Sequence, residues 1–301
     1  MSPHIVRKPL FYMYGIIVVF LLPCLNIAAR AQDSAAEQEI QAAAEVMKKA
    51  LVPGPKNVPL GGRAVIELPE KFAFVPKAEA ARFMRALGNM VDKDFIGLVL
   101  GERLSGFVAI EFSPSGYIKD DDAKDWNTDE LLQNLKDGTE RANKERTKRG
   151  LPEIAVLGWI EKPAYDASAH RLVWSASSQR KNAPPGEEQG VNYNTYLLGR
   201  EGYLSLNLVT DADSVEGEKP VAKQLLAAVG FNNGQRYEDF NAATDHVAEY
   251  GLAALVGGLA AKKLGLLAVI GVFLVKTWKI ILLGLLAAVA IGKRFFKRKE
   301  T

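Results

Sequence analysis

Cysteine and histidine are scarce in this sequence, and their scarcity excludes several kinds of site. The 301 residues include one cysteine, Cys24, and three histidines. Cys24 lies in an apolar N-terminal run that we expect to be removed, so the mature chain has no thiol for disulfides, thiol catalysis or cysteine-ligated metals. The Gly-x-Ser-x-Gly, His-Glu-x-x-His and phosphate-binding Gly-Lys-Ser/Thr patterns are also absent. We therefore predict no catalytic residues and no cofactor.

The N-terminus has the features of a secretion signal. Arg7 and Lys8 precede an almost wholly apolar run over 10–29, and Ala29-Arg30-Ala31 places small residues at the positions that a signal peptidase requires. We predict a signal peptide over 1–31, cleaved before Gln32. The alternatives are an uncleaved anchor and a lipoprotein, but Pro23 occupies the position before Cys24 where a small residue is normal.

A second apolar segment lies near the C-terminus. Residues 251–292 carry only four charges, all lysines, and the tail 293–301 is strongly basic. We predict a membrane anchor over 251–292 followed by a basic cytoplasmic tail, because positive residues favour the cytoplasmic side. The basic residues expected at the membrane are Lys262, Lys263, Lys276, Lys279, Lys293 and Arg294.

Two of these lysines complicate the anchor. A span over 264–292 places Lys276 and Lys279 near the bilayer centre, where each costs roughly 3 kcal/mol on insertion scales. Snorkelling reduces this cost, and a span over 251–275 avoids it. In a third alternative, the lysines line an oligomeric channel.

The region between the two apolar segments is acidic. Residues 32–250 hold 26 basic and 34 acidic residues, for a net charge of −8, although the whole chain is +3. Phosphate contacts need clustered lysine and arginine, so we expect no nucleic-acid partner. The expected partners are the lipid bilayer and either another envelope protein or further copies of the chain. We expect an inner-membrane protein, single-pass, with its body in the periplasm.

Periodicity predicts several helices in this body. Apolar residues at helical spacing indicate a helix over 32–51, and the Pro/Gly-rich stretch up to residue 62 completes an N-terminal helix-and-linker region. A domain over 63–250 follows. Within it, Asn127 and Glu130 have the spacing of a capping box at the start of a long helix. Pro220 is expected to open the final helix.

Alternating apolar residues predict an antiparallel sheet. Strands over 154–160 and 171–177 form one expected hairpin, and strands over 191–198 and 203–209 form a second one around Gly199–Gly202. In the last strand three leucines alternate with Ser205 and Asn207, which indicates one buried and one wetter face. The predicted fold class is α+β, an antiparallel sheet packed with helices, plus the C-terminal transmembrane helix. The order of elements over 64–232 resembles the Mog1/PsbP sandwich.

An acidic run is the sharpest local feature. Asp120, Asp121, Asp122 and Asp125 could supply oxygen ligands to Ca²⁺ or Mg²⁺. Lys124 stands where a further ligand would be needed, so the four carboxylates are weak metal candidates. The simpler interpretation is a solvated turn before the helix that Asn127 caps.

Polar and aromatic residues on the predicted sheet suggest a binding face. Aromatic rings could hold a sugar or peptide, and asparagines on the hairpin strands could line a cleft, although core packing and solvent exposure are the simpler accounts. Arg200 and Glu201 are expected to form an exposed pair in the hairpin turn. The binding candidates are Tyr117, Trp126, Asn192, Tyr193, Asn194 and Arg200.

Several long strings resemble a family of bacterial membrane-anchored proteins, the domain of unknown function 2167. They are SGYIKDDDAKDW (115–126), ANKERTKRGLPEIAVLGW (142–159), RLVW (171–174), VNYNTYLLGREGYLSLNL (191–208) and FNNGQRYEDFNAATDHVAEYGLAALVGG (231–258). The resemblance implies an envelope protein with a C-terminal anchor, and it implies no activity. We therefore predict a non-catalytic binding or scaffolding module, with a metal-assisted hydrolase using the acidic run and a lysine-lined channel as alternatives.

Overall fold

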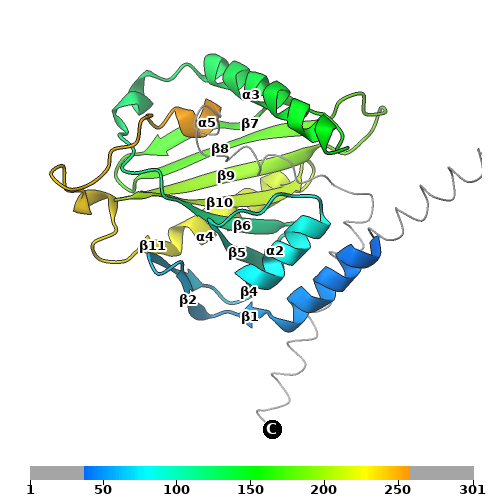
Figure 1. Ribbon diagram of the computed structural model, residues 1–301, viewed down its shortest axis with the longest axis horizontal. Helices are drawn as coiled ribbons and strands as arrows, with labels where there is room; N and C mark the ends of the chain where they lie inside the picture. The colour runs from blue at the N-terminus through cyan, green and yellow to red at the C-terminus, as the bar shows by residue number, and fades with distance from the viewer. Residues whose placement is uncertain (1–36, 258–301) are drawn as a thin grey trace, which may run out of the picture.

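The computed structural model describes residues 37–257, which form an α+β fold around one large antiparallel sheet (Figure 1). Eight strands lie in the order β1-β4-β5-β6-β10-β9-β8-β7, and a second sheet has the order β11-β3-β2. The large sheet comprises β1 (Val52–Pro53), β4 (Phe72–Pro76), β5 (Phe95–Gly101), β6 (Phe107–Ser113), β7 (Ile154–Asp166), β8 (Arg171–Arg180), β9 (Gly190–Gly199) and β10 (Gly202–Asp211). The small sheet comprises β2 (Lys56–Leu60), β3 (Ala64–Leu68) and β11 (Val229–Phe231). The predicted α+β class is confirmed.

Both predicted hairpins are present. Strand β7 pairs with β8 from Ile154↔Arg180 to Asp166↔Arg171, and β9 pairs with β10 from Gly199↔Gly202 onward. Strand β7 is longer than expected, because three register shifts let it continue to Asp166. Residues 52–62, expected to be a linker, instead contribute β1 and β2 to the body.

One face of the large sheet is covered by helix α4 (Val215–Ala227) and the small sheet. The leucines of β10 pack there against Val221 and Leu225 of α4 and Ile66 of β3, and all of these side chains are almost completely buried. Helix α4 begins at Val215, before Pro220, which corrects the expected start. Val215 packs in this core, and Glu218 accepts a hydrogen bond from the Ser105 N–H, so tertiary contacts extend the helix across the proline.

The opposite face is covered at its two ends by separate groups of helices (Figure 1). At one end, α2 (Lys77–Ala86) and the first helix, described over 37–49, pack on β4, β5 and β6. At the other end, α3 (Thr128–Lys148) and the short α5 (Ala254–Gly257) pack on β7, β8 and β9. The predicted N-cap of α3 is confirmed, since Asn127 Oδ1 accepts from the backbone N–H groups of Asp129 and Glu130 at 3.0 and 3.3 Å.

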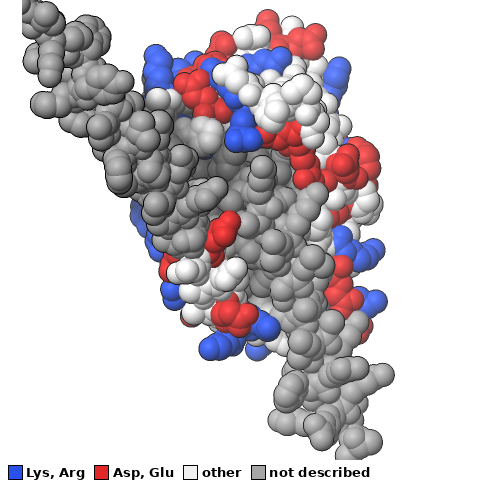
Figure 2. Space-filling model, turned by 90° about the vertical axis from the view of Figure 1, so that its right-hand side faces the viewer, with Lys and Arg blue, Asp and Glu red and all other residues white. Residues whose placement is uncertain are grey.

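The surface carries interspersed charges. On the face seen in Figure 2, acidic and basic side chains of the described part lie in small mixed groups. Some surface charges are paired; for example, Lys181 Nζ lies 2.6 Å from Glu140 and 2.9 Å from Glu153. Such exposed pairs contribute little stability.

Residues 251–257, the expected start of the anchor, belong to the folded body. Leu252 and Val256 are completely buried, and α5 packs against α3. Within residues 37–257 the structure contains no helix with the length and apolar character needed to cross a bilayer. The signal peptide, the rest of the anchor with all six membrane lysine and arginine candidates, and the basic tail lie outside the described residues.

Candidate binding cavity

A cavity of about 100 Å³ lies on this face of the sheet, beside α3 and α5. The sheet supplies its floor from β6, β8, β9 and β10, while Leu135 of α3 and Ala254, Leu255 and Val256 at α5 supply a wall. Small-molecule sites are commonly concave, apolar regions with a few placed polar groups. This cavity has that character.

Strand register aligns the polar side chains of the floor into a stripe. Glu111 of β6 lies opposite Ser205 of β10, and Ser205 lies opposite Tyr196 of β9. In the next row, Asn207 of β10 lies opposite Asn194 of β9. Residues two apart on a strand share a face, so both rows lie on the floor. We call Glu111, Asn194, Tyr196, Ser205 and Asn207 the polar stripe.

The asparagines leave one acceptor open. Asn207 Nδ2 donates to Asn192 Oδ1 at 3.2 Å, and Asn194 Nδ2 donates to the Asn192 backbone oxygen at 3.1 Å. Asn207 is 5% exposed, and its Oδ1 is buried with no hydrogen-bond partner among the described residues. Leaving a buried acceptor unpaired costs about 1–3 kcal/mol. A ligand that donates a hydrogen bond to Asn207 Oδ1 would recover this cost.

Glu111 is the acidic residue of the stripe. Its side chain is 9% exposed, and burial, followed by repulsion from Asp92 and Asp94, raises its pKa to about 7. The cavity lining contains no lysine, arginine or histidine, so no described cation neutralises Glu111 there. Titratable groups in clefts with shifted pKa values are frequent at functional sites.

Aromatic side chains form the other end of the floor. Tyr196 and Tyr203 meet edge to face with ring centroids 5.6 Å apart, and Trp174 meets Trp159 in the same way at 5.9 Å. Burial raises the pKa of both Tyr196 and Tyr203 above the usual value. Both phenols are therefore neutral at physiological pH, and this end of the cavity is uncharged.

The predicted binding residues fall in several places. Asn192 and Asn194 line the cavity. Tyr193 points to the opposite face, where it is completely buried and its hydroxyl donates to Glu161 at 3.0 Å. Tyr117 stacks on Tyr237 with centroids 4.4 Å apart. Trp126 is half-buried at the α3–α5 end of the sheet. The structure thus brings only the two asparagines together at one site.

The acidic run is divided among different contacts. Asp122 accepts from the N–H groups of Leu252 and Ala253 at 3.1 and 2.9 Å, and so caps the start of α5. Asp120 accepts from the Tyr165 hydroxyl at 2.7 Å. Asp121 and Asp125 are exposed. Within 37–257, no three acidic, histidine or cysteine side chains are grouped so that they could hold a metal ion.

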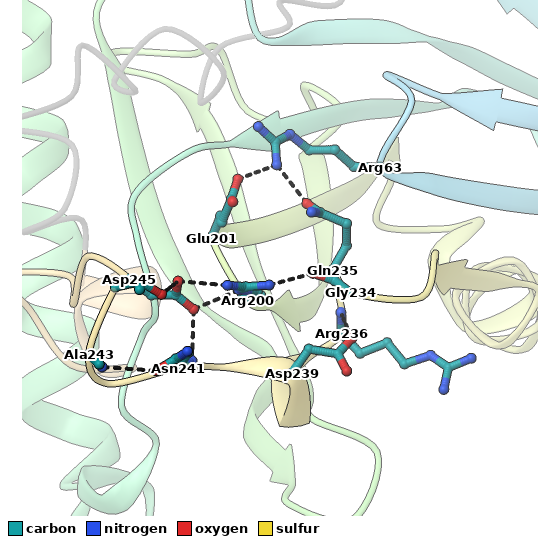
Figure 3. A network of polar contacts seen from close by, with 11 residues as sticks. Arg63, Arg200, Glu201, Gly234, Gln235, Arg236, Asp239, Asn241, Ala243 and Asp245 are labelled. Carbon is teal, nitrogen blue, oxygen red and sulfur yellow. Dashed lines mark hydrogen bonds and ion pairs between the residues drawn. The ribbon is translucent and has the colours of Figure 1, made fainter.

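A second polar network joins the β9–β10 turn to the segment before α5 (Figure 3). Arg200 donates to both carboxylate oxygens of Asp245, at 2.6 and 2.8 Å, and this ion pair is the main reason that the pKa of Asp245 lies well below its usual value. Arg63 contacts Glu201 and donates to Gln235 Oε1 at 2.6 Å. Arg200 and Glu201, expected to pair with each other, thus bind different partners. These contacts fasten the segment before α5 to the β9–β10 turn and to Arg63.

Within the polar stripe, the sequence analysis did not identify Glu111, and it placed Ser205 on the wetter face of its strand without naming it as a binding residue. Glu111 is the only charged residue in β6, Phe107–Ser113, and an acid within an apolar strand was an available signal. The alignment of Glu111 with Ser205 was not available, because it depends on pairing between strands about 90 residues apart in the chain.

Comparison with known proteins adds a family and a distant likeness. The family described as protein of unknown function (DUF2167) matches residues 52–286. No curated protein matches the chain. A solution structure of cyanobacterial PsbP (CyanoP) from Synechocystis sp. PCC 6803 has 6% identity and a TM-score of 0.35, and the match covers 59% of this chain and 92% of that one. The family match extends over most of the sequence, and the chain belongs to the DUF2167 family of proteins of unknown function.

Proposed function

We propose that this protein is a membrane-tethered binding module of the cell envelope, and that its ligand site is the cavity at α3, α5 and the sheet. The observation that carries the proposal is the polar stripe. It places Glu111 and the open Asn207 Oδ1 on a cavity floor, although a sheet face under helices is normally apolar. A protein that only scaffolds has no use for these buried polar groups, whereas a ligand site requires them.

The acidic run does not support the hydrolase alternative, because Asp120 and Asp122 hold Tyr165 and the start of α5. The lysines of the channel alternative lie outside the described residues. The cavity, in contrast, has side chains suited to binding a small polar molecule.

We further propose that the body lies in the periplasm and is tethered by the apolar segment that follows α5. The support is the signal-like N-terminus and the basic residues after 292. With Cys24 replaced, a single cysteine at the exposed Ala167 should react with a membrane-impermeant maleimide in cells with a permeabilised outer membrane. A single cysteine at Thr301 should not react. Reaction at Thr301 and not at Ala167 would reverse the orientation and refute this location.

Filling the cavity tests the binding site. Ser205→Phe adds a ring to the middle of the stripe and should abolish the binding of small polar molecules that raise the melting temperature of the wild-type chain in detergent. Ala167→Phe adds the same ring in the exposed β7–β8 turn and should leave binding intact. Ligands that bind wild type and Ser205→Phe equally would show that the site is elsewhere. The absence of any binder in a broad library would count against a binding function.

A further inference from the structure

We propose that the cavity selects a small organic cation, with an ammonium or guanidinium group held at Glu111 and an apolar portion held by the aromatic end. This inference rests on the proposed function, since it names the class of ligand for the same cavity. Three features of the lining support it: the distribution of charge, the hydrogen-bonding groups left open, and the order of side chains along the stripe.

The charged side chains that line the cavity are all acidic. Glu111 and Asp94 are both present, and no cationic side chain is among the lining residues. Asp92, on the same loop as Asp94, adds to the negative potential at Glu111. Removing a partly buried carboxylate from water is unfavourable unless a cation or several donors compensate it. An organic cation supplies this compensation, and the described residues of the lining do not.

Two buried side-chain atoms of the lining have no hydrogen-bond partner among the described residues, the acceptor Asn207 Oδ1 and the donor Trp174 Nε1, and the acceptor is the one that belongs to the polar stripe with Glu111. The Asn207 amide nitrogen donates to Asn192, which leaves Asn207 Oδ1 free. Ammonium and guanidinium groups carry only donors, so they match a site that presents a carboxylate and an amide oxygen. Hydrogen bonds between a charged donor and a carboxylate are also stronger than neutral ones. Donors on the ligand could therefore satisfy Glu111 and Asn207 together.

Along the polar stripe, uncharged aromatic side chains follow Glu111. Ser205 lies between Glu111 and Tyr196 in one row, and Trp174 lies opposite Asn194 in the next. Aromatic rings attract cations and also pack against alkyl or aryl groups. A cavity of about 100 Å³ admits only a small ligand. The expected ligand is thus a short amine or guanidine with one apolar substituent.

An anion is the opposite possibility, because a protonated Glu111 could donate to a carboxylate. The charges around Glu111 argue against it. Asp92 and Asp94 face it from the loop before β5, Tyr196 and Tyr203 are neutral, and the residues of α3 and α5 that line the cavity are not ionisable. Lys93 and Lys77 lie near Asp94, but neither is among the described residues that line the cavity, so an anion in the cavity would meet carboxylates and no lining cation.

The test uses propylammonium and benzylammonium as probes, with 1-propanol, benzyl alcohol and propionate as controls. Binding to the full chain in detergent is followed by calorimetry and by fluorescence, because Trp174 lines the cavity. The ammonium probes should bind at least about tenfold more tightly than the alcohols, and propionate should not bind. As the pH is raised toward 7, Glu111 ionises and the affinity for the ammonium probes should increase by up to about tenfold per pH unit. Above pH 7 the affinity should level off.

Two substitutions test whether Glu111 and Asp94 are responsible for binding the ammonium probes. Glu111→Gln keeps the size of the side chain, should weaken the ammonium probes at least about tenfold and should remove the pH dependence. Asp94→Asn should weaken them less. Circular dichroism and the melting temperature show whether each variant folds, and Asp94→Asn carries the test if Glu111→Gln does not fold. Equal binding of alcohols and ammonium probes, tighter binding of propionate, or unchanged binding in both variants overturns the inference. If uncharged ligands bind and Ser205→Phe abolishes their binding, the proposed binding function is supported and the preference for a cation is refuted.

Discussion

Gly202→Ala is expected to destabilise the body by about 3 kcal/mol, because two constraints act on this residue together. Gly202 has a φ of +153°, which side-chain-bearing residues rarely adopt. A Cβ at this position would lie 1.9 Å from the backbone oxygen of Ser113 on β6. That oxygen belongs to the paired strand, so the clash can be relieved only by separating β10 from β6 at the end of the cavity floor.

Gly217→Ala is the matched control for this substitution. Gly217 lies in helix α4, has no positive φ, and has no atom within 4 Å of an added Cβ. Alanine there should stabilise the protein by up to about 1 kcal/mol, because it is the better helix former. Urea unfolding of the full chain in detergent, followed by tryptophan fluorescence, measures both changes. A Gly202→Ala loss below about 1 kcal/mol would mean that β6 and β10 separate easily.

Local patterns predicted much of the fold because the interactions responsible are themselves local. The cap of α3 depends on three consecutive residues, Asn127 to Asp129, and their neighbour Glu130. The alternation of leucines in β10 with Ser205 and Asn207 follows from the two-residue period of a strand, and the structure confirms that the leucine side is buried. The glycines of the β9–β10 turn indicated a hairpin, which is present.

The features that were not predicted depend on contacts between distant segments. The start of α4 was placed at Pro220, but Val215 and Glu218 pack against residues far away in sequence and extend the helix. The partner of Arg200 was expected to be its neighbour Glu201, and is instead Asp245. Tyr193 was expected on the binding face with Asn192 and Asn194, yet adjacent residues of a strand point to opposite faces, so only the asparagines reach the cavity.

The last described residues of the chain lie beside the cavity. Ala254, Leu255 and Val256 form part of the cavity wall, and α5 ends at Gly257, directly before the rest of the predicted anchor. Asp122 fixes the start of this wall through two backbone hydrogen bonds. A ligand in the cavity would contact α5, so binding is expected to stabilise the docked position of α5 by mass action.

Replacing Glu111 by glutamine is expected to stabilise the protein above pH 7 and to change its dependence on pH. In the folded state the pKa of Glu111 is about 7, against 4.5 for an unperturbed glutamate. Between these values the folded protein holds a proton that the unfolded chain has released, so stability falls as pH rises through this window. The loss is complete above pH 7 and amounts to about 3 kcal/mol for this group alone.

The informative quantity is the difference in unfolding free energy between Glu111→Gln and wild type, because other titrating groups cancel in it. This difference should rise by about 3 kcal/mol in favour of the variant between pH 4.5 and pH 8. Glu67→Gln, at an exposed position of β3, should follow wild type throughout and is the matched control. Urea titrations at several pH values measure all three proteins.

Parallel curves for Glu111→Gln and wild type would show that Glu111 is already ionised in the folded protein and has a cationic partner of its own. A wild-type loss that saturating propylammonium reverses would show that the missing partner is the ligand, because a bound cation stabilises the carboxylate that burial disfavours.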